Sequence, residues 1–297
     1  MIPPGVTALT CGGATVAWIL GPGDAWTGPK VAKEALEVRG MALEQTADLV
    51  TACERLLEDD CVTLVEHSAG GVVPAGCVVL GDPAALVVVG ATVEPMVVFD
   101  VRKGPIVLEP GSIAKAGTRL EGPLYVGQHS WLLGGTIRSS SIGPHCRVHG
   151  ELTASVFIGY ANKAHDGFVG HSVLGHWANL GAGTITSNLK NTYGQIRLEL
   201  PNGRWETGRS FLGSLIGDHA KAGIGTLLST GSVVCAGANV LAGALPRFVE
   251  PFLWDQTQRL TLDGFLAIAR RVMPRRGVQV TADIEASLAS LHNRFAR

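Results

Sequence analysis

Two polar stretches of the sequence contain the residue types needed for group transfer to an amine. The first is Asn162-Lys163-Ala164-His165-Asp166-Gly167, and the second runs from Asn179 through Lys190. Histidine titrates near neutral pH, so His165 could take the proton that an ammonium group must lose before its nitrogen attacks a thioester. The same pattern also fits a corner histidine among solvated asparagines, and spacing alone leaves that alternative open.

The remaining polar residues of this region suit an anionic acceptor. Lys163 and Lys190, with the nearby Arg138 and Arg197, could hold a phosphate group. The backbone N–H groups of Gly181-Ala182-Gly183 could approach a ligand or a developing oxyanion, because glycine leaves room there. The candidate substrate-binding residues are Asn162, Lys163, Asn188, Lys190 and Arg138.

Both stretches lie within a region that repeats every sixteen residues. A fixed period indicates stacked supersecondary units, with the aliphatic residue pointing inward and glycine at a tight corner. The sequence therefore predicts a mainly β protein: a left-handed parallel β-helix of hexapeptide repeats over about residues 72 to 245. Successive coils would place the two polar stretches on one side. The repeated pairs are Val126-Gly127, Ile142-Gly143, Ile158-Gly159 and Leu174-Gly175.

Composition agrees with this fold and narrows the class of protein. The chain has 39 glycines in 297 residues, and 16% of its residues are charged, below the usual 25% or so. A net charge of −1 gives no electrostatic reason to expect nucleic acid or a membrane as partner. The six cysteines are scattered without a C-x-x-C pair, so we expect reduced thiols, no metal site and a cytoplasmic protein.

Three regions are expected along the chain. Residues 1–70 predict a small α/β segment, with a helical pattern over Pro29–Leu57. Residues 71–250 form the β-helix, with a hairpin insertion near 190–210, because Asn-Gly between strand-like runs is a hairpin signal. Residues 251–297 predict C-terminal helices capped by Thr261 and Thr281.

The run from His165 through Asn188 resembles the acetyltransferase domain of the bifunctional N-acetylglucosamine-1-phosphate uridyltransferase and glucosamine-1-phosphate acetyltransferase family. The resemblance is stronger still to the alternative branch common in Bacteroidetes-type bacteria, and it covers about residues 95 to 275. The motifs are Gly159–Phe168, Gly181-Ala182-Gly183-Thr184-Ile185-Thr186-x-Asn188, Ser187–Tyr193, Ile216–His219 and Pro246–Phe252.

This resemblance implies an acetyl-CoA-dependent enzyme of nucleotide-sugar biosynthesis in which His165 is the general base and Asn188 contacts a sugar phosphate. It further implies that Ala182 and Ala242, with Gly183, lie along an acetyl-CoA cleft between adjacent subunits of a homotrimer. Three positions depart from the family pattern. The acetyl-CoA serine is replaced by Ile224, the substrate-binding tyrosine by Phe168 and the phosphate-binding lysine by Thr153.

The N-terminal stretch Leu9–Thr15 lacks the arginine and third glycine of that family's nucleotide-binding loop, and residues 1–70 more closely resemble the trailing part of a truncated nucleotidyltransferase domain. We therefore expect nucleotidyl transfer to be lost or supplied by another chain. The leading hypothesis is acetyl transfer, without a metal, to the amino group of a glucosamine-1-phosphate-like sugar phosphate. The alternatives are a sugar-1-phosphate nucleotidyltransferase-related protein and a catalytically silent β-helix scaffold or partner subunit.

Overall fold

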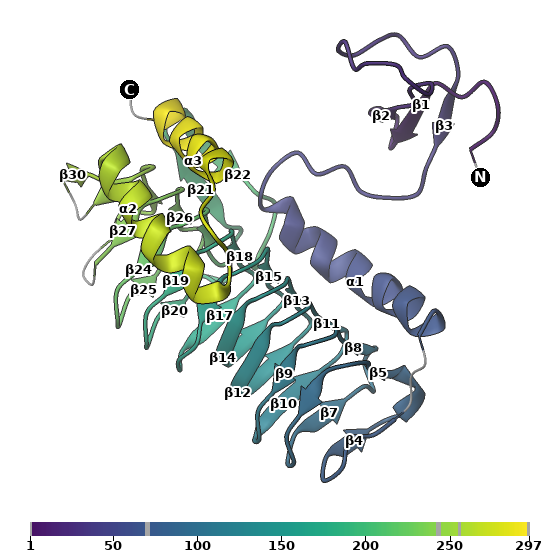
Figure 1. Ribbon diagram of the computed structural model, residues 1–297, viewed down its shortest axis with the longest axis vertical. Coiled ribbons are helices and arrows are strands. Elements are labelled where there is room, and N and C mark those ends of the chain that lie inside the picture. Colours follow the sequence, from purple (N-terminus) through teal and green to yellow (C-terminus); the bar gives the residue numbers. More distant parts are fainter. Residues whose placement is uncertain (1, 69–71, 242–244, 255–256, 296–297) are drawn as a thin grey trace. The chain divides into compact units, whose positions relative to one another are not determined.

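The computed structural model describes residues 2–68, 72–241, 245–254 and 257–295 of the chain. The chain divides into two compact units, Met1–Asp48 and Leu49–Arg297, and each is considered by itself (Figure 1). Within the described ranges, none of the helices combines the length and the apolar character that crossing a membrane requires.

The first unit is a small sheet in the order β2-β1-β3, with β1 (Ala8–Cys11), β2 (Ala14–Trp18) and β3 (Ala35–Glu37). Strands β1 and β2 pair antiparallel, and Cys11 is opposite Ala14. Gly12 and Gly13 therefore form the two-residue turn, with the positive φ angles of 59° and 79° that such a turn requires. The helix expected over Pro29–Leu57 is wrong in its first half, because β3 pairs with β1 there.

Helix α1 (Asp48–Glu66) packs on the β-helix. Its buried residues Cys53, Leu57 and Cys61 recur at helical spacing and contact Val87 and Val107 of the coils. The boundary between the compact units consequently falls at Asp48 and not near residue 70.

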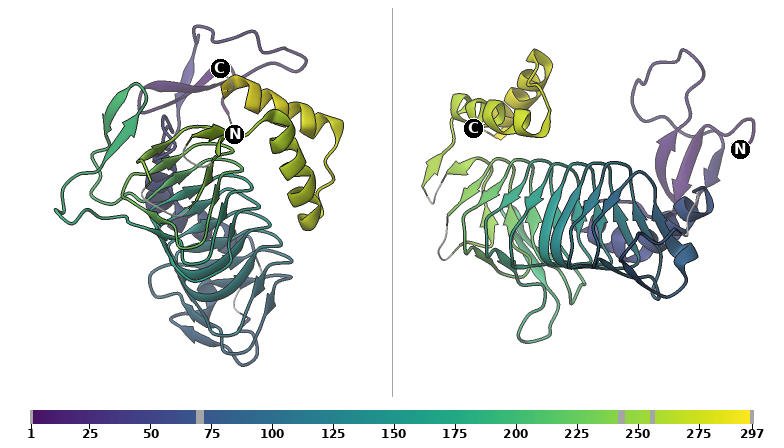
Figure 2. Two further views of the ribbon diagram at one scale, coloured as in Figure 1. Left: turned by 90° about the vertical axis from the view of Figure 1, so that its left-hand side faces the viewer. Right: turned by 60° about the horizontal axis from the view of Figure 1, so that its bottom comes forward.

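The second unit is a left-handed β-helix whose coils stack along one axis (Figures 1 and 2). One face is a parallel sheet in the order β28 (Phe248–Val249), β26 (Val233–Val234), β23 (Leu215–Ile216), β18 (Val173–Leu174), β15 (Val156–Phe157), β13 (Ser141–Ile142), β11 (Leu124–Val126), β8 (Ile106–Leu108) and β5 (Leu86–Val88).

The other two faces are joined by long strands that turn the corner between them. Their sheet runs in the order β30 (Gln258–Arg259), β29 (Leu253–Trp254), β27 (Asn239–Val240), β24 (Lys221–Ala222), β19 (Asn179–Leu180), β16 (Asn162–Lys163), β14 (Arg147–Thr153), β12 (Trp131–Arg138), β10 (Thr118–Glu121), β7 (Val98–Asp100) and β4 (Val78–Leu80). Off this path lie β17 (Phe168–Gly170), β9 (Ile113–Ala114), β6 (Thr92–Val93), the pair β20 (Ile185–Thr186) and β25 (Leu227–Leu228), and the short helix η1 (Pro83–Ala85).

The strand register confirms the sequence repeat, with one shift. Val126 pairs with Ile142, Ile142 with Phe157, and Phe157 with Leu174, and all four side chains are buried in the aliphatic interior. Phe157, rather than the expected Ile158, therefore fills the interior of its coil.

One corner of the coils carries a column of stacked rings, which we call the aromatic ladder. Its members take positive φ angles, which non-glycine residues rarely adopt, and successive ring centroids lie 4.3 to 6.2 Å apart. The stacking thus continues from coil to coil outside the aliphatic interior. The ladder residues are His129, His145, Tyr160, Trp177 and His219.

The C-terminal helices pack against the end of this ladder. Helices α2 (Leu262–Val272) and α3 (Ala282–Phe295) flank the short helix η2 (Met273–Arg276). The ring of Phe265 on α2 meets His219 edge-on at 5.2 Å. Both α helices begin where the sequence predicts, because the hydroxyls of Thr261 and Thr281 accept from the backbone N–H groups of Gly264 and Ile284.

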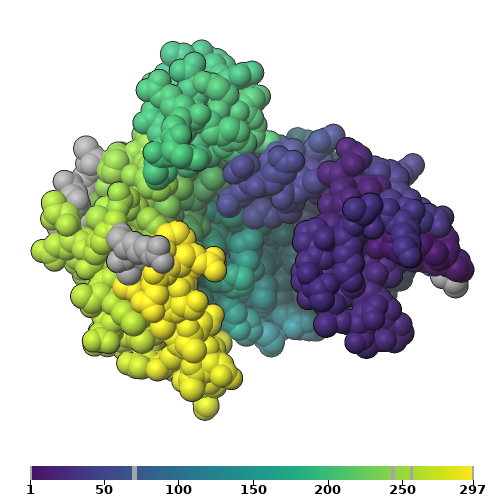
Figure 3. Space-filling view, turned by 90° about the horizontal axis from the view of Figure 1, so that it is seen from above, coloured from purple at the N-terminus to yellow at the C-terminus, as the bar shows by residue number. Residues whose placement is uncertain are grey.

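A hairpin leaves the coil stack between two coils. Strands β21 (Arg197–Leu200) and β22 (Gly203–Glu206) pair antiparallel around Pro201-Asn202-Gly203, as the Asn-Gly signal predicts. The segment stands out from the β-helix in Figures 2 and 3.

The close stacking of the coils generates a stability prediction. A Cβ atom on Gly143 would lie 2.1 Å from the carbonyl oxygen of Ile158 in the next coil, whereas a Cβ on the exposed Gly194 meets only the Thr192 hydroxyl, at 3.7 Å. Gly143→Ala should therefore lower the free energy of unfolding by about 3 kcal/mol, because coil stacking must open to admit the methyl group. Gly194→Ala should change it by less than about 0.5 kcal/mol. Urea denaturation checks both variants, and equal effects would contradict the reason given.

Candidate functional site

His165 lies at the corner between β16 and β17, and its side chain is exposed. The backbone of this corner is held from inside the coil, because the Lys163 ammonium donates to the carbonyl oxygens of His165 and Asp166, the latter at 2.9 Å. The corner is therefore fixed by its backbone while the imidazole remains free to meet a ligand.

The sequence predicts that Lys163 lines an open groove, but the structure does not place it there. Strand alternation turns its side chain inward, where it is 1% exposed, while its neighbour Asn162 points outward. Burial lowers the pKa of Lys163 to about 8. The side chain positions the His165 corner and is not available to an acceptor phosphate.

The glycine-rich turn of the next coil stacks directly on this corner. The N–H of Gly183 donates to the Asp166 carbonyl at 3.0 Å, and the N–H of Gly225 in the following coil donates to the Ala182 carbonyl at 2.7 Å. The Gly183 amide is thus committed to coil stacking, whereas the Ala182 N–H has no hydrogen-bond partner in the described part of the chain. The expected cofactor contact Ala242 lies outside the described residues.

A second histidine, which the sequence pattern did not single out, lies beside the same corner on the preceding coil. The Nδ1 atom of His149 is 3.1 Å from Oδ1 of Asp166. Its side chain comes from β14, and its position follows from coil register rather than from any local motif. His149 is therefore a second titratable side chain beside the His165 corner.

Asn188 lies at the opposite end of the β17 face from His165. Its amide nitrogen is 2.8 Å from Nδ1 of His171, the residue that follows β17. Nε2 of His171 lies 3.5 Å from a carboxylate oxygen of Glu54 on α1, and the ring of Phe211 stacks on His171 at 5.1 Å. Burial lowers the pKa of His171. The structure therefore brings Ala182 and Gly183 to His165, but places Asn188 in a separate network under α1.

The positions that depart from the family pattern lie along this same face. A Cβ on Gly170 would meet the ring of Phe168 at 2.5 Å and the amide of Asn188 at 2.6 Å, so Phe168 lies between the His165 corner and Asn188. Thr153 pairs with Gly170 in the adjacent coil. Ile224 is 74% exposed and belongs to the coil that follows Ala182.

The expected phosphate-binding cations are already paired within the chain. Arg138 forms an ion pair with Glu151 at 2.5 Å, and Arg197 forms one with Glu206 at 2.8 Å. The Lys190 ammonium donates to the carbonyl of Gln195 in the loop before the hairpin. These side chains could reach a ligand only by leaving their present partners.

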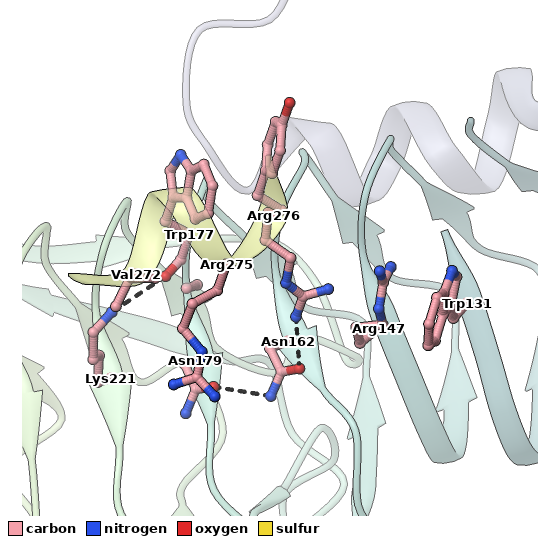
Figure 4. Close-up of a pocket in the computed structure, with 11 residues that line it drawn as sticks. Trp131, Arg147, Asn162, Trp177, Asn179, Lys221, Val272, Arg275 and Arg276 are labelled. Carbon is pink, nitrogen blue, oxygen red and sulfur yellow. Dashed lines mark hydrogen bonds between the residues drawn. The ribbon is translucent and has the colours of Figure 1, made fainter. Parts of the chain in front are cut away.

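Asn162 faces a different space from His165. Its amide nitrogen donates to Oδ1 of Asn179 at 2.9 Å, and its own Oδ1 accepts from Arg276 at 3.2 Å. These residues line a pocket between the coils and η2 (Figure 4).

Comparison with curated proteins finds relatives over about half of the chain. It is 31% identical over 151 residues to a bifunctional sugar-1-phosphate nucleotidylyltransferase/acetyltransferase of Sulfurisphaera tokodaii, covering 48% of this chain and 37% of the relative. It is 30% identical over 154 residues to the bifunctional protein GlmU of Methanocaldococcus jannaschii, with 48% and 35% covered. The GlmU protein of Methanococcus vannielii is 33% identical over 94 residues, covering 32% of this chain and 22% of the relative.

No protein-family model matches the chain. The chain spans between about a fifth and two fifths of the length of these relatives. Because the first unit ends at Asp48, most of a 151-residue match must lie in the β-helix unit. The curated homologues of this chain are bifunctional GlmU-type sugar-1-phosphate nucleotidyltransferase/acetyltransferases, and this confirms the resemblance seen in its motifs.

The buried Lys163 predicts a pH dependence of stability. Its pKa is 10.5 in the unfolded chain and about 8 in the folded one, so between these values the unfolded chain binds more protons. Stability contributed by this residue should therefore rise from pH 8 to pH 10.5. Lys163→Met should remove the part of this rise that comes from Lys163. Lys221, whose pKa burial lowers in the same way, should still contribute its part of the rise. Urea denaturation at several pH values measures the slope. The exposed Lys103→Met is the control, and a slope unchanged by Lys163→Met would contradict this assignment.

Proposed function

We propose that the β-helix unit transfers an acetyl group from acetyl-CoA to the amino group of a sugar phosphate, with His165 as general base. The observation that carries this proposal is an exposed histidine on a corner fixed by Lys163, directly next to the Ala182-Gly183 turn of the following coil. A homologue named as a nucleotidylyltransferase/acetyltransferase supports the same reaction class.

The chemistry assigned to the corner follows from the species involved. The acceptor arrives as an ammonium ion, and its nitrogen becomes a nucleophile when the imidazole of His165 removes a proton. The amine then attacks the thioester carbonyl, and the oxygen of that carbonyl gains negative charge. A backbone N–H that is not used in coil stacking suits this charge, and Ala182 offers one. Collapse of the intermediate breaks the C–S bond and forms the amide, and the CoA thiolate takes up the proton that the amide nitrogen loses. The imidazolium of His165 then releases its proton to solvent.

The acceptor is proposed to lie along the β17 face, starting from His165. Asn188, beyond Phe168, flanks this path as a substrate contact, whereas Asn162 faces the separate pocket beside η2. Lys163 acts as a positioning residue, because its ammonium binds the carbonyls of the corner. Arg138 and Lys190 contribute to phosphate binding only after leaving Glu151 and the Gln195 carbonyl.

The acting species is proposed to be a homotrimer. Large apolar side chains are exposed on the coils at and after the Ala182 turn, and contiguous apolar surface of this kind favours association. Ile185 and Leu227 are paired across adjacent coils, so they form one continuous patch. A neighbouring subunit on this patch would close the donor cleft between subunits, with cyclic symmetry. The residues and their exposed fractions are Ile185 (42%), Ile224 (74%), Leu227 (65%) and Leu241 (52%).

Nucleotidyl transfer by the first unit is disfavoured as the alternative function. Gly12 and Gly13 form a hairpin turn, and the N–H of Gly12 donates to a carboxylate oxygen of Glu37 at 2.6 Å. A carboxylate at this amide competes with and repels the triphosphate that a glycine-rich nucleotide loop must hold. The scaffold alternative makes a different prediction, which is that no acetyl transfer occurs.

Removing the imidazole tests the proposed reaction. His165→Ala should lower kcat for thiol release from acetyl-CoA, with glucosamine-1-phosphate as acceptor, by about 10²- to 10⁴-fold. Its melting temperature should stay unchanged, because the side chain is exposed. The matched control is His176→Ala, which removes another exposed corner histidine. Full activity of His165→Ala would exclude it as the base, and a wild-type protein inactive with every amino sugar phosphate would favour the scaffold.

A charge placed in the apolar patch tests the assembly. Leu227→Asp should convert the trimer to a monomer, because burying an unpaired carboxylate in a subunit interface is costly. Val78→Asp, which places the same charge on an exposed residue of β4, should leave the assembly intact. Light scattering after size-exclusion chromatography gives the mass. A wild-type mass equal to the 31.0 kDa of one chain would contradict the proposed trimer.

A further inference from the structure

A pocket of about 590 Å³ lies between the β-helix and η2, and its function is not explained by the reaction proposed above. Its floor comes from β12, β14, β16 and β19, and its other wall from the C-terminal helices (Figure 4). Neither His165 nor Ala182 lines it. Its volume is in the range of pockets that bind small molecules. The residues used below are Trp131, Arg147, Asn162, Asn179, Arg275 and Arg276.

The pocket is cationic, and among the described residues no acidic side chain lines it. Arg147, Arg275 and Arg276 converge there, joined by Lys221, and none of these four forms an ion pair within the described ranges. Arg270, one turn before η2, behaves differently and pairs with Glu285 at 2.5 Å. The cations of the pocket are therefore gathered without a counter-charge of the kind that Arg270 has in Glu285.

Partial burial makes this arrangement of like charges costly. Burial, and then the charge of Arg276, lowers the pKa of Arg147 to about 10. Burial also lowers the pKa of Arg276, and the charge of Arg275 lowers it further. Each guanidinium thus remains charged beside another charge of the same sign, and a bound anion would relieve the repulsion.

The remaining groups supply directional donors and a flat wall. The side chain of Arg276 donates to Asn162, and Asn162 donates to Asn179, so the chain of hydrogen bonds ends in the amide nitrogen of Asn179, which is a donor. The guanidinium of Arg147 stacks on the Trp131 ring at 4.0 Å from the centroid, which orients its N–H groups. Guanidinium forks match phosphate oxygens two at a time.

We propose that this pocket binds a phosphate-bearing small molecule, with the phosphate held by Arg147, Arg275 and Arg276 and with a hydroxyl oxygen of the ligand accepting from the side-chain amide of Asn179. The site is formed when η2 packs on the coils, since its arginines and Arg147 are far apart in the sequence. It does not depend on acetyl transfer. The phosphate could belong to a sugar phosphate or to a CoA-type nucleotide, and the ligand panel of the experiment distinguishes these sources.

The test measures binding and requires no turnover. The full chain is titrated with pyrophosphate, glucosamine-1-phosphate and CoA, and glucosamine is the reference that lacks a phosphate. Binding is followed by calorimetry and by intrinsic tryptophan fluorescence, to which Trp131 and Trp177 of the pocket contribute. Arg276→Gln should raise the Kd of the phosphate ligands at least tenfold. Arg271→Gln, which removes an exposed arginine from α2 outside the pocket, should leave Kd unchanged. Arg275→Gln is a second variant in case Arg276→Gln folds poorly.

Specific results would overturn the proposal. Absence of saturable binding by every phosphate ligand would do so, as would equal weakening by Arg276→Gln and Arg271→Gln, which indicates a general effect of surface charge. Tighter binding of glucosamine-1-phosphate than of CoA assigns the site to a sugar phosphate, and the reverse order assigns it to a nucleotide. Either assignment supports the site even if the chain proves unable to transfer acetyl groups.

Discussion

Every functional feature of this protein depends on the hydrogen-bonded stacking of one coil on the next. Each coil must repeat the path of its neighbour, because the backbone N–H groups of one strand donate to the carbonyls of the next. Where two backbones approach most closely, as at Gly143 and Ile158, no space remains for a side chain. Variation is consequently confined to outward-facing positions, corners and insertions, and the candidate site uses all three.

Stacking also explains how a site can be rigid without a conventional enclosed pocket. The corner with His165 is held between the Lys163 ammonium inside the coil and the Gly183 amide of the next coil. An exposed imidazole on such a corner loses little conformational freedom when a ligand binds, because the backbone beneath it is already ordered. Preorganisation here comes from the repeat itself rather than from a surrounding shell of side chains.

The polar side chains of the β-helix fall into two groups with different physical roles. Arg138, Arg209 and Arg270 neutralise carboxylates of neighbouring segments, and such pairs link the coils to α1 or join α2 to α3. The arginines around η2 have no such partner among the described residues, and His165 is exposed. Cations that are gathered without a carboxylate partner are a physical sign of a ligand site, because holding like charges together costs stability.

The sequence by itself determined the repeat, the hairpin at Asn202-Gly203, the caps of the C-terminal helices and the placement of His165 at a coil corner, because each depends on local spacing or turn chemistry. Tertiary structure alone decided that Lys163 points inward and that Phe157 replaces Ile158 in the interior, since both depend on strand register between coils. Register also separated Asn188 from His165. The arginine pocket was beyond sequence reasoning, because its two walls are distant in the chain and meet only through the packing of η2 on the coils.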